Sequence, residues 1–205
     1  MLPWAIRIFL NTMLGLLFKK VISLSGMKNE RVILAGEQFS LTLQRLGYQL
    51  IEEYDDFSNT CIIGIQEGGV LLADRLCDFL LKNTPLTKID YGKLDITFYR
   101  DDFRRGKTLK AHATQMNFLV ENKRVILVDD VLYTGRSVQA AMSALQHYGR
   151  AASMELVALV DRRFNRHLPI QPDYTGILID SLDDAYVRVE WAQEEGEEDK
   201  IILIN

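Results

Sequence analysis

The stretch VILVDDVLYTGRS, residues 125–137, decides how the rest of this sequence can fold. Its first four residues are apolar and predict a buried strand over 124–128. The spacing after Ser137 predicts a helix to Tyr148, closed by Gly149. Between strand and helix stand two adjacent carboxylates and a short loop with hydroxyl groups and one glycine. A strand, a polar loop and a helix in this order are the building unit of a parallel sheet.

The segments on either side repeat the alternation of apolar strands and amphipathic helices. Residues 100–122 are polar and basic without a clear period, which predicts a long loop. The last two strands flank EEGEED and predict a hairpin around Gly196. The predicted helices span 37–54 and 70–81, and the predicted strands span 61–65, 92–99, 155–160, 186–191 and 200–204.

This pattern predicts an α/β fold, a mostly parallel twisted sheet flanked by helices on both faces. Ligands of such sheets bind beyond the carboxyl ends of the strands. The places to search for chemistry are therefore 66–69, 129–137 and the residues from Asp161 onward. Each of these follows a predicted buried strand.

The loop after the central strand combines groups that bind an anion with groups that repel one. Backbone N–H groups at a helix start favour a phosphate, Gly135 lets the backbone approach it, and Thr134 and Ser137 offer hydroxyl donors. Asp129 and Asp130 would repel that phosphate and suit a sugar diol or magnesium instead. A site that binds a phosphate at one end and a sugar diol at the other suits a ribose 5-phosphate. A merely structural acidic turn with a serine-capped helix explains either aspartate alone but not the whole pattern.

The composition is that of one soluble globular domain. The chain has 205 residues, of which 48% are hydrophobic and 25% charged, so it can bury a sizeable core. A formal net charge of −4 excludes a global positive field of the kind that attracts nucleic acid. Cys61 and Cys77 predict two reduced core thiols of a cytoplasmic protein, rather than a disulfide or a zinc pair.

Residues 1–26 differ in composition from the rest. They contain three basic residues and no acid, so 21 basic and 28 acidic residues remain, a net charge of −7 for 27–205. The apolar run at 8–18 is too short to span a bilayer. Lys19 and Lys20 follow that run, which is the wrong order for a signal peptide. We interpret 1–26 as an extension, an amphipathic helix ahead of a domain that begins at Met27.

Four motifs, taken together and in this order, resemble the bacterial pyrimidine-operon attenuator/uracil phosphoribosyltransferase family, a branch of the type I phosphoribosyltransferases. They are DITFYRDD, LVDDVLYTGRSVQAAMSAL, LVDR and LPIQPDYTG. The resemblance runs from about Arg31 to the C-terminus. It implies one phosphoribosyltransferase domain over 27–205 with a small hood, and a homo-oligomer, dimeric or higher. It also implies phosphoribosyl pyrophosphate (PRPP) and a nucleobase as substrates, with Mg2+ as cofactor.

The resemblance implies a role for each matching position. Asp129 and Asp130 would hold the ribose hydroxyls and reach the metal indirectly, through PRPP. Arg100 would share the catalytic role with them, as part of a flap. The PRPP-binding positions would be Asp129, Asp130, Val131, Leu132, Tyr133, Thr134, Gly135, Arg136 and Ser137. The pyrophosphate loop would be Gln66, Glu67, Gly68 and Gly69, and the base would be received by Asp161, Arg162, Tyr174 and Thr175.

Two stretches depart from the family pattern. The family carries threonine and arginine where this chain has Glu67 and Gly68, so we expect Glu67 to point away from the pyrophosphate or to contact metal. The hood stretch 163–167 is one residue longer than in the family and unlike it. Beyond Arg100, further flap cations would close over the pyrophosphate and exclude water. These cations are Arg104, Arg105, Lys107 and Lys110.

Three functions stay open on this basis. The first is an enzyme that converts uracil and PRPP into UMP and pyrophosphate. Tyr133 favours it, because similar purine enzymes commonly carry a carboxylate there, and a phenol does not replace that base at neutral pH. The second is an RNA-binding regulator of pyrimidine operon attenuation, which the net charge of −7 for 27–205 disfavours. The third is a purine (hypoxanthine/guanine) phosphoribosyltransferase, which would differ in the hood.

Deletion of residues 1–26 tests the domain boundary. The family motifs and the first predicted strand lie after Met27, so we expect the truncated chain to stay soluble and to bind PRPP as the full chain does. Its free energy of unfolding should change by less than about 0.5 kcal/mol, as for a change outside the fold. Chemical unfolding and a PRPP titration measure both quantities. Loss of solubility or of PRPP binding would show that the segment belongs to the folded domain.

Overall fold

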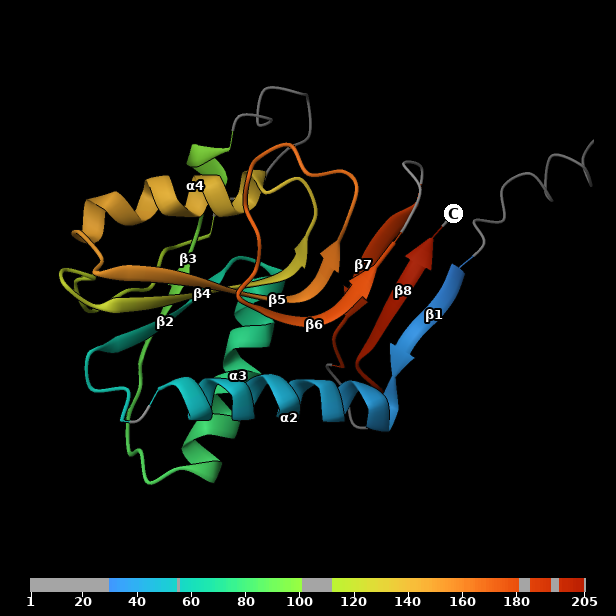
Figure 1. The fold of residues 1–205 in the computed structure, drawn as a ribbon, viewed down its shortest axis with the longest axis horizontal. Helices are drawn as coiled ribbons and strands as arrows, with labels where there is room; N and C mark the ends of the chain where they lie inside the picture. The colour runs from blue at the N-terminus through green and yellow to red at the C-terminus, as the bar shows by residue number, and fades with distance from the viewer. Residues whose placement is uncertain (1–29, 55, 101–111, 181–184, 193–195, 205) are drawn as a thin grey trace, which may run out of the picture.

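The computed structural model of the chain describes residues 30–54, 56–100, 112–180, 185–192 and 196–204. At its centre lies a five-stranded sheet of order β3-β2-β4-β5-β6, in which every neighbouring pair is parallel (Figure 1). The strands are β2 (Thr60–Ile65), β3 (Asp90–Leu94), β4 (Arg124–Leu132), β5 (Ser153–Arg162) and β6 (Tyr174–Ile179). The predicted α/β class with a mostly parallel sheet is confirmed.

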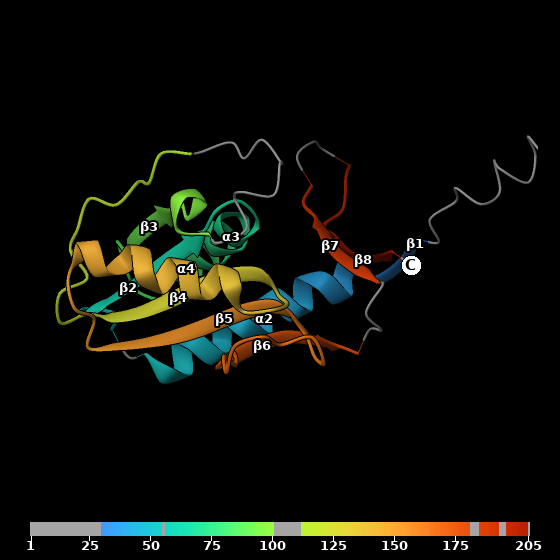
Figure 2. The ribbon, with the colours of Figure 1, turned by 90° about the horizontal axis from the view of Figure 1, so that it is seen from above.

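Helices cover both faces of this sheet, as Figures 1 and 2 show. The helices α2 (Gly36–Glu53) and α3 (Gly68–Asn83) cover one face, and α4 (Arg136–Leu145) covers the other, with the short 3-10 helices η1 (Thr97–Tyr99) and η2 (Gln146–Tyr148). Along β4, Ile126 and Val128 pack toward α2 and α3, whereas Val125 and Leu127 pack toward α4. Each such buried aliphatic side chain contributes about 1.5–3 kcal/mol. No helix among the described residues is long and apolar enough to cross a membrane.

Both ends of the described chain join in a second, antiparallel sheet. It consists of β1 (Glu30–Ala35), β8 (Lys200–Ile204) and β7 (Tyr186–Glu190), in the order β1-β8-β7. The predicted hairpin is confirmed, because β7 pairs with β8 and Gly196 between them has a φ of 95°. The first three residues of β1 are exposed, and this sheet lies beside the main one (Figure 1).

Several element boundaries differ from the sequence prediction. The strand β3 ends before Asp95, and η1 replaces the predicted end of that strand. The Asp95 carboxylate accepts hydrogen bonds from the N–H and the hydroxyl of Thr97, at 2.8 and 2.6 Å, and these turn the chain out of the sheet. Both β4 and β5 run further than predicted, because backbone pairing continues to the Leu132–Asp161 pair. The β6 segment begins with Tyr174 and Thr175, which the resemblance assigned to the hood, and it forms the edge strand.

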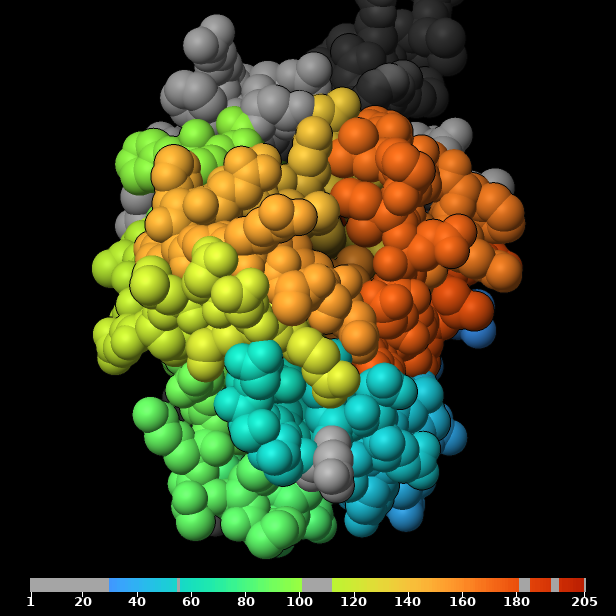
Figure 3. Space-filling model, turned by 60° about the vertical axis from the view of Figure 1, so that its left-hand side comes forward, coloured from blue at the N-terminus to red at the C-terminus, as the bar shows by residue number. Residues whose placement is uncertain are grey.

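Loops are hydrogen-bonded to one another where the strands begin. The N–H of Val120 donates to the carbonyl of Tyr148 at 2.9 Å, and the N–H of Asn122 donates to the carbonyl of Arg150 at 2.8 Å. Figure 3 shows this side of the molecule, where the yellow surface before β4 adjoins the orange surface after α4. The carboxyl ends of the strands lie at the opposite end of the sheet, where ligands of parallel sheets bind.

The two cysteines are buried, free thiols, as predicted. Cys61 lies on β2 and Cys77 on α3, and burial raises the pKa of each thiol to about 12. Both are therefore protonated at neutral pH and behave as small apolar side chains.

Candidate active site

A cavity of about 590 Å³ opens at the carboxyl end of β4. Its walls are Asp129, residues 131–138, Arg100 and His167. Arg100 directly follows η1. It lies 29 positions before Asp129 in the sequence, and the fold brings it to the cavity that the predicted PRPP loop lines. The four other cations predicted for the flap, Arg104, Arg105, Lys107 and Lys110, lie outside the described residues.

The loop between β4 and α4 has the backbone of an anion site. Gly135 adopts φ 88° and ψ −2°, a left-handed conformation that suits glycine, and α4 begins directly after it. Gly135 stands at the N-cap of α4, so the serine-capped helix considered from the sequence does not form. The N–H of Arg136 donates to Oγ1 of Thr134 at 3.4 Å. The N–H groups that follow in the first turn have no partner within the helix and can donate to a ligand or to water.

Two carboxylates stand beside this loop, on β4 itself. Asp129 is 7% exposed, and its Oδ1 accepts a hydrogen bond from the N–H of Asp130 at 3.1 Å. Oδ1 of Asp130 in turn accepts from the N–H of Val131 at 2.8 Å. Burial raises the pKa of both carboxyls, and the charge of Asp130 raises the pKa of Asp129 further. The cation of Arg100, which lines the same cavity, acts against this rise in the pKa of Asp129.

The predicted pyrophosphate turn lies against the acid pair. A Cβ atom at Gly68 would overlap the carboxylate of Asp130, and one at Gly69 would overlap the carbonyl oxygen of Val128. Glycine at both positions therefore lets the start of α3 approach the carboxyl end of β4. The family has arginine at the position of Gly68. A side chain there would overlap Asp130, which gives a physical reason for the glycine in this chain.

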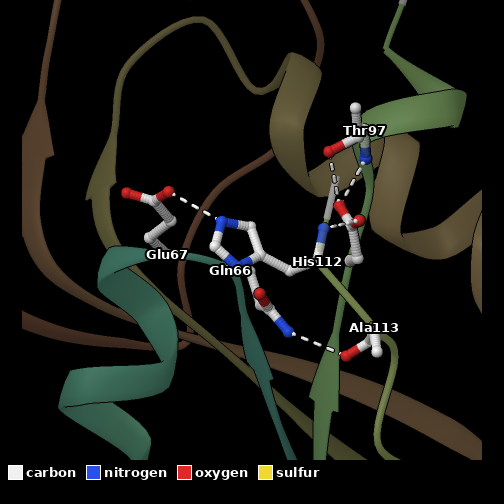
Figure 4. Close-up of polar contacts among 6 residues, drawn as sticks. Gln66, Glu67, Thr97, His112 and Ala113 are labelled. Carbon is white, nitrogen blue, oxygen red and sulfur yellow. Dashed lines mark hydrogen bonds and ion pairs between the residues drawn. The ribbon is translucent and has the colours of Figure 1, made fainter. Parts of the chain in front are cut away.

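Glu67, the other departure in that turn, lies in a second cavity of about 470 Å³. Its Oε1 accepts a hydrogen bond from Nε2 of His112 at 2.9 Å, as Figure 4 shows. Gln66 lines the same cavity, and its Nε2 donates to the carbonyl of Ala113 at 3.2 Å. Two residues of the turn are thus hydrogen-bonded to His112 and Ala113, the first residues described after 101–111.

The hood contacts the β4–α4 loop through Tyr133. The guanidinium of Arg162 lies 4.0 Å from the centre of the Tyr133 ring, and Arg166 donates to the carbonyl of Tyr133 at 2.6 Å. Arg166 also forms an ion pair with Asp161. Tyr133 therefore packs between the phosphate loop and the hood, and its ring is stacked on a cation.

A third cavity, of about 340 Å³, is formed by hood residues together with β5 and β6. Two of the predicted base-binding residues, Asp161 and Thr175, line it. The other two do not. Arg162 is 3% exposed and stacks on Tyr133, and Tyr174 at the start of β6 donates its hydroxyl to Oε2 of Glu155 at 2.7 Å.

Two histidines belong to the site although the sequence patterns did not indicate them. His167 lines the 590 Å³ cavity; its N–H donates to the carbonyl of Thr134 at 3.1 Å, and Nε of Arg136 donates to its Nδ1 at 3.4 Å. The unusual hood stretch 163–167 was the signal that could have pointed to it. His112 gave no signal, because its place depends on how the chain returns after 101–111.

Asp129 and Asp130 carry oxygen ligands of the kind that Mg2+ prefers. Among the residues that the structure describes, no three His, Cys, Asp or Glu side chains gather into a metal-binding group. A cation held next to the buried Asp129 and the half-buried Asp130 would offset the burial that raises the pKa of both carboxyls.

The sequence pattern of the phosphoribosyl transferase domain matches residues 31–194. The chain belongs to this family. The bifunctional protein PyrR of Gloeothece citriformis is 43% identical over 157 residues, which cover 77% of this chain and 88% of that protein. The protein of the same name from Listeria monocytogenes is 38% identical over 181 residues, covering 86% and 98%. The family resemblance inferred from the four motifs is therefore confirmed.

Solved phosphoribosyltransferase structures share the fold. A hypoxanthine phosphoribosyltransferase from Trypanosoma cruzi superposes with a TM-score of 0.64 at 16% identity, covering 87% of this chain and 96% of that one. One from Staphylococcus aureus gives a TM-score of 0.59 at 24% identity, covering 77% and 80%. At these identities the likeness shows the fold of the family and no more.

The raised pKa values of the acid pair predict the sign of a stability effect. A carboxyl whose pKa is higher in the folded chain stabilises the fold only while protonated. That contribution is complete below the ordinary value of 3.8 and is lost as the pH rises through the higher folded pKa. We therefore expect the pair to make the fold less stable at neutral pH than at acidic pH.

We expect the double variant Asp129→Asn/Asp130→Asn to lose PRPP binding and turnover, yet to be more stable than the wild type at neutral pH by about 0.5–2 kcal/mol. The gain should shrink toward acidic pH. Urea unfolding across the pH range measures it, with Asp78→Asn on the exposed side of α3 as the control. Near-normal activity would remove the pair from the site, and lower stability at neutral pH would make the two carboxylates structural.

Proposed function

We propose that this chain transfers ribose 5-phosphate from PRPP to uracil, giving UMP and pyrophosphate. The observation that carries the proposal is one cavity in which the β4–α4 anion loop, the buried carboxylate Asp129 and Arg100 meet. Few ligands need an anion site and a pair of hydrogen-bond acceptors side by side. A ribose 5-phosphate does, because its phosphate and its diol lie at opposite ends of one small molecule.

Each part of the ribose 5-phosphate has a matching group in the cavity. The first N–H groups of α4 and the hydroxyls of Thr134 and Ser137 would donate to the phosphate oxygens. The carboxylates of Asp129 and Asp130 would accept from the ribose hydroxyls. These hydrogen bonds would relieve part of the unfavourable burial that raises the pKa of both carboxyls.

The reaction breaks the bond between the anomeric carbon of ribose and a pyrophosphate oxygen. A new bond forms from that carbon to a ring nitrogen of the base, and the proton of that nitrogen passes to the departing pyrophosphate or to water. Positive charge develops on the ribose ring in between, and the nearby carboxylates would stabilise it electrostatically. Arg100 would stabilise the negative charge on the departing pyrophosphate. Magnesium, held through PRPP beside Asp129 and Asp130, would supply further positive charge to the pyrophosphate.

Uracil is favoured over a purine by Tyr133 and by the relatives. Tyr133 stacks under Arg162 and presents no carboxylate that could exchange a proton with a purine. The relatives that cover most of the chain are named bifunctional protein PyrR, whereas the hypoxanthine enzymes share only the fold. Arg166, paired with Asp161 at the edge of the hood cavity, would offer N–H donors to a pyrimidine carbonyl.

An RNA-binding regulator is the second candidate, favoured by the word "bifunctional" in the names of the relatives. A net charge of −7 over 27–205 would confine any RNA contact to a local basic surface. Filter binding of the chain to the leader transcript of its own operon tests this candidate. If the filter retains the leader transcript even when unrelated RNA is added as a competitor, the candidate is supported. If both RNAs are retained equally, the candidate is contradicted.

A panel of nucleobases assayed with PRPP and magnesium tests the proposed function. We expect UMP from uracil, with a kcat/KM at least about tenfold above that for hypoxanthine or guanine, since one well-placed hydrogen bond separates substrates by this much or more. Chromatography of the nucleotide products measures it. Turnover of hypoxanthine in preference to uracil would identify a purine enzyme. If the chain binds PRPP but converts none of the bases, it is a PRPP-binding protein and not a transferase for these bases.

Arg100→Ala should lower the maximal rate by roughly ten- to a thousandfold, on the scale of losing one transition-state donor. Affinity for PRPP should fall less than the rate. Stability should change by under about 0.5 kcal/mol. Arg150→Ala, exposed at the opposite end of the sheet, is the matched control. Unchanged kinetics would remove Arg100 from the mechanism, and a collapsed melting temperature would make it structural.

A further inference from the structure

The pyrophosphate turn carries an acid that already has a partner. Oε1 of Glu67 accepts a hydrogen bond from Nε2 of His112 at 2.9 Å, and the two side chains are 75% and 41% exposed. In Figure 4 the carboxylate and the ring point toward each other from the end of β2 and from the segment after 101–111. A carboxylate oxygen only accepts here, so Nε2 of His112 carries the hydrogen.

His112 is held in this place by the backbone. Its N–H donates to Oδ2 of Asp95 at 2.6 Å, while Oδ1 of Asp95 accepts from Thr97, at the start of η1. Burial acts to raise the pKa of Asp95, but the hydrogen bonds from Thr97 and His112 outweigh it and lower that pKa. Asp95 is thus ionised at neutral pH. Its carboxylate joins η1, which leads to Arg100, to the segment that begins at His112. The imidazole is thereby kept beside the turn.

The turn itself supplies no cation to a pyrophosphate. Its residues are Gln66, Glu67, Gly68 and Gly69, and a side chain at Gly68 would overlap Asp130. Lys93 lines the same 470 Å³ cavity, but it forms an ion pair with Asp74 at 3.1 Å. Among the described residues that line this cavity, His112 is the one whose side chain donates a hydrogen bond to Glu67 of the turn.

We propose that His112 is a pyrophosphate-binding residue, and that the Glu67 carboxylate occupies its Nε2–H until the diphosphate of PRPP or free pyrophosphate replaces it. This rests on the proposed function. A diphosphate oxygen is an anionic acceptor like the carboxylate oxygen, so the exchange keeps the hydrogen bond of His112. Glu67 is mostly exposed, and an exposed pair of this kind contributes little to stability, so the carboxylate can swing into water. Glu67 is therefore a built-in competitor of the anion.

The assignment predicts opposite effects for the two partners. Glu67→Gln removes the competing charge and should tighten binding of magnesium pyrophosphate by roughly two- to tenfold, the range expected for one exposed charge contact. His112→Ala should weaken it by a similar factor. In the His112→Ala background the gain from Glu67→Gln should fall to less than about half, because the two side chains act on one hydrogen bond. Glu52→Gln, an exposed acid on α2, is the matched control.

Calorimetric titrations of the full-length chain with magnesium pyrophosphate and, separately, with ribose 5-phosphate measure these effects. Ribose 5-phosphate has no diphosphate, so all variants should bind it equally. Weaker or unchanged pyrophosphate binding by Glu67→Gln would overturn the assignment, and so would unchanged binding by His112→Ala. If the wild-type chain itself fails to bind ribose 5-phosphate, the proposed function falls and the assignment with it. Normal ribose 5-phosphate binding separates the two failures.

Discussion

The arrangement of this site depends on two neighbouring carboxylates at the carboxyl end of β4, the buried Asp129 and the half-buried Asp130. Burial raises the pKa of both carboxyls, and the charge of Asp130 raises the pKa of Asp129 further, so we expect the folded chain to be less stable at neutral pH than it would be with amides there. The apolar residues of β4 fill the core on both sides of this pair, with Val125 to Val128 before it and Leu132 after it. Two adjacent acids with raised pKa values, set between apolar core residues, are typical of a functional site.

The rest of the architecture brings complementary groups to that pair. Parallel pairing of β2 and β4 places the ends of both strands at one edge of the sheet. Glycines at 68 and 69 then let α3 begin against β4 with no side chain between. On the other side Gly135 turns the chain sharply into α4, so that helix N–H groups and carboxylates stand a few residues apart. The start of α3 against β4 and the sharp turn into α4 therefore place an anion site and a diol site next to each other.

The sequence predicted these features unevenly, for physical reasons. The β4–α4 unit was predictable because an apolar run, an acid pair and a glycine act locally. Strand ends were not, because β4 continues only by virtue of its pairing with β5, and β3 stops because the Asp95 side chain binds Thr97. The base-binding roles of Tyr174 and Arg162 come from the resemblance and stay predictions. Their contacts with Glu155 and Tyr133 could not be read from the sequence, because they join residues on different elements. The pairing of Glu67 with His112 depends on tertiary structure alone.

A crystal structure of the chain with ribose 5-phosphate would test the proposed site most directly. We expect the phosphate to lie against the first N–H groups of α4, near Thr134 and Ser137, with both ribose hydroxyls hydrogen-bonded to Asp129 and Asp130. A phosphate bound anywhere else, or a sugar turned so that its hydroxyls avoid the two carboxylates, would contradict it.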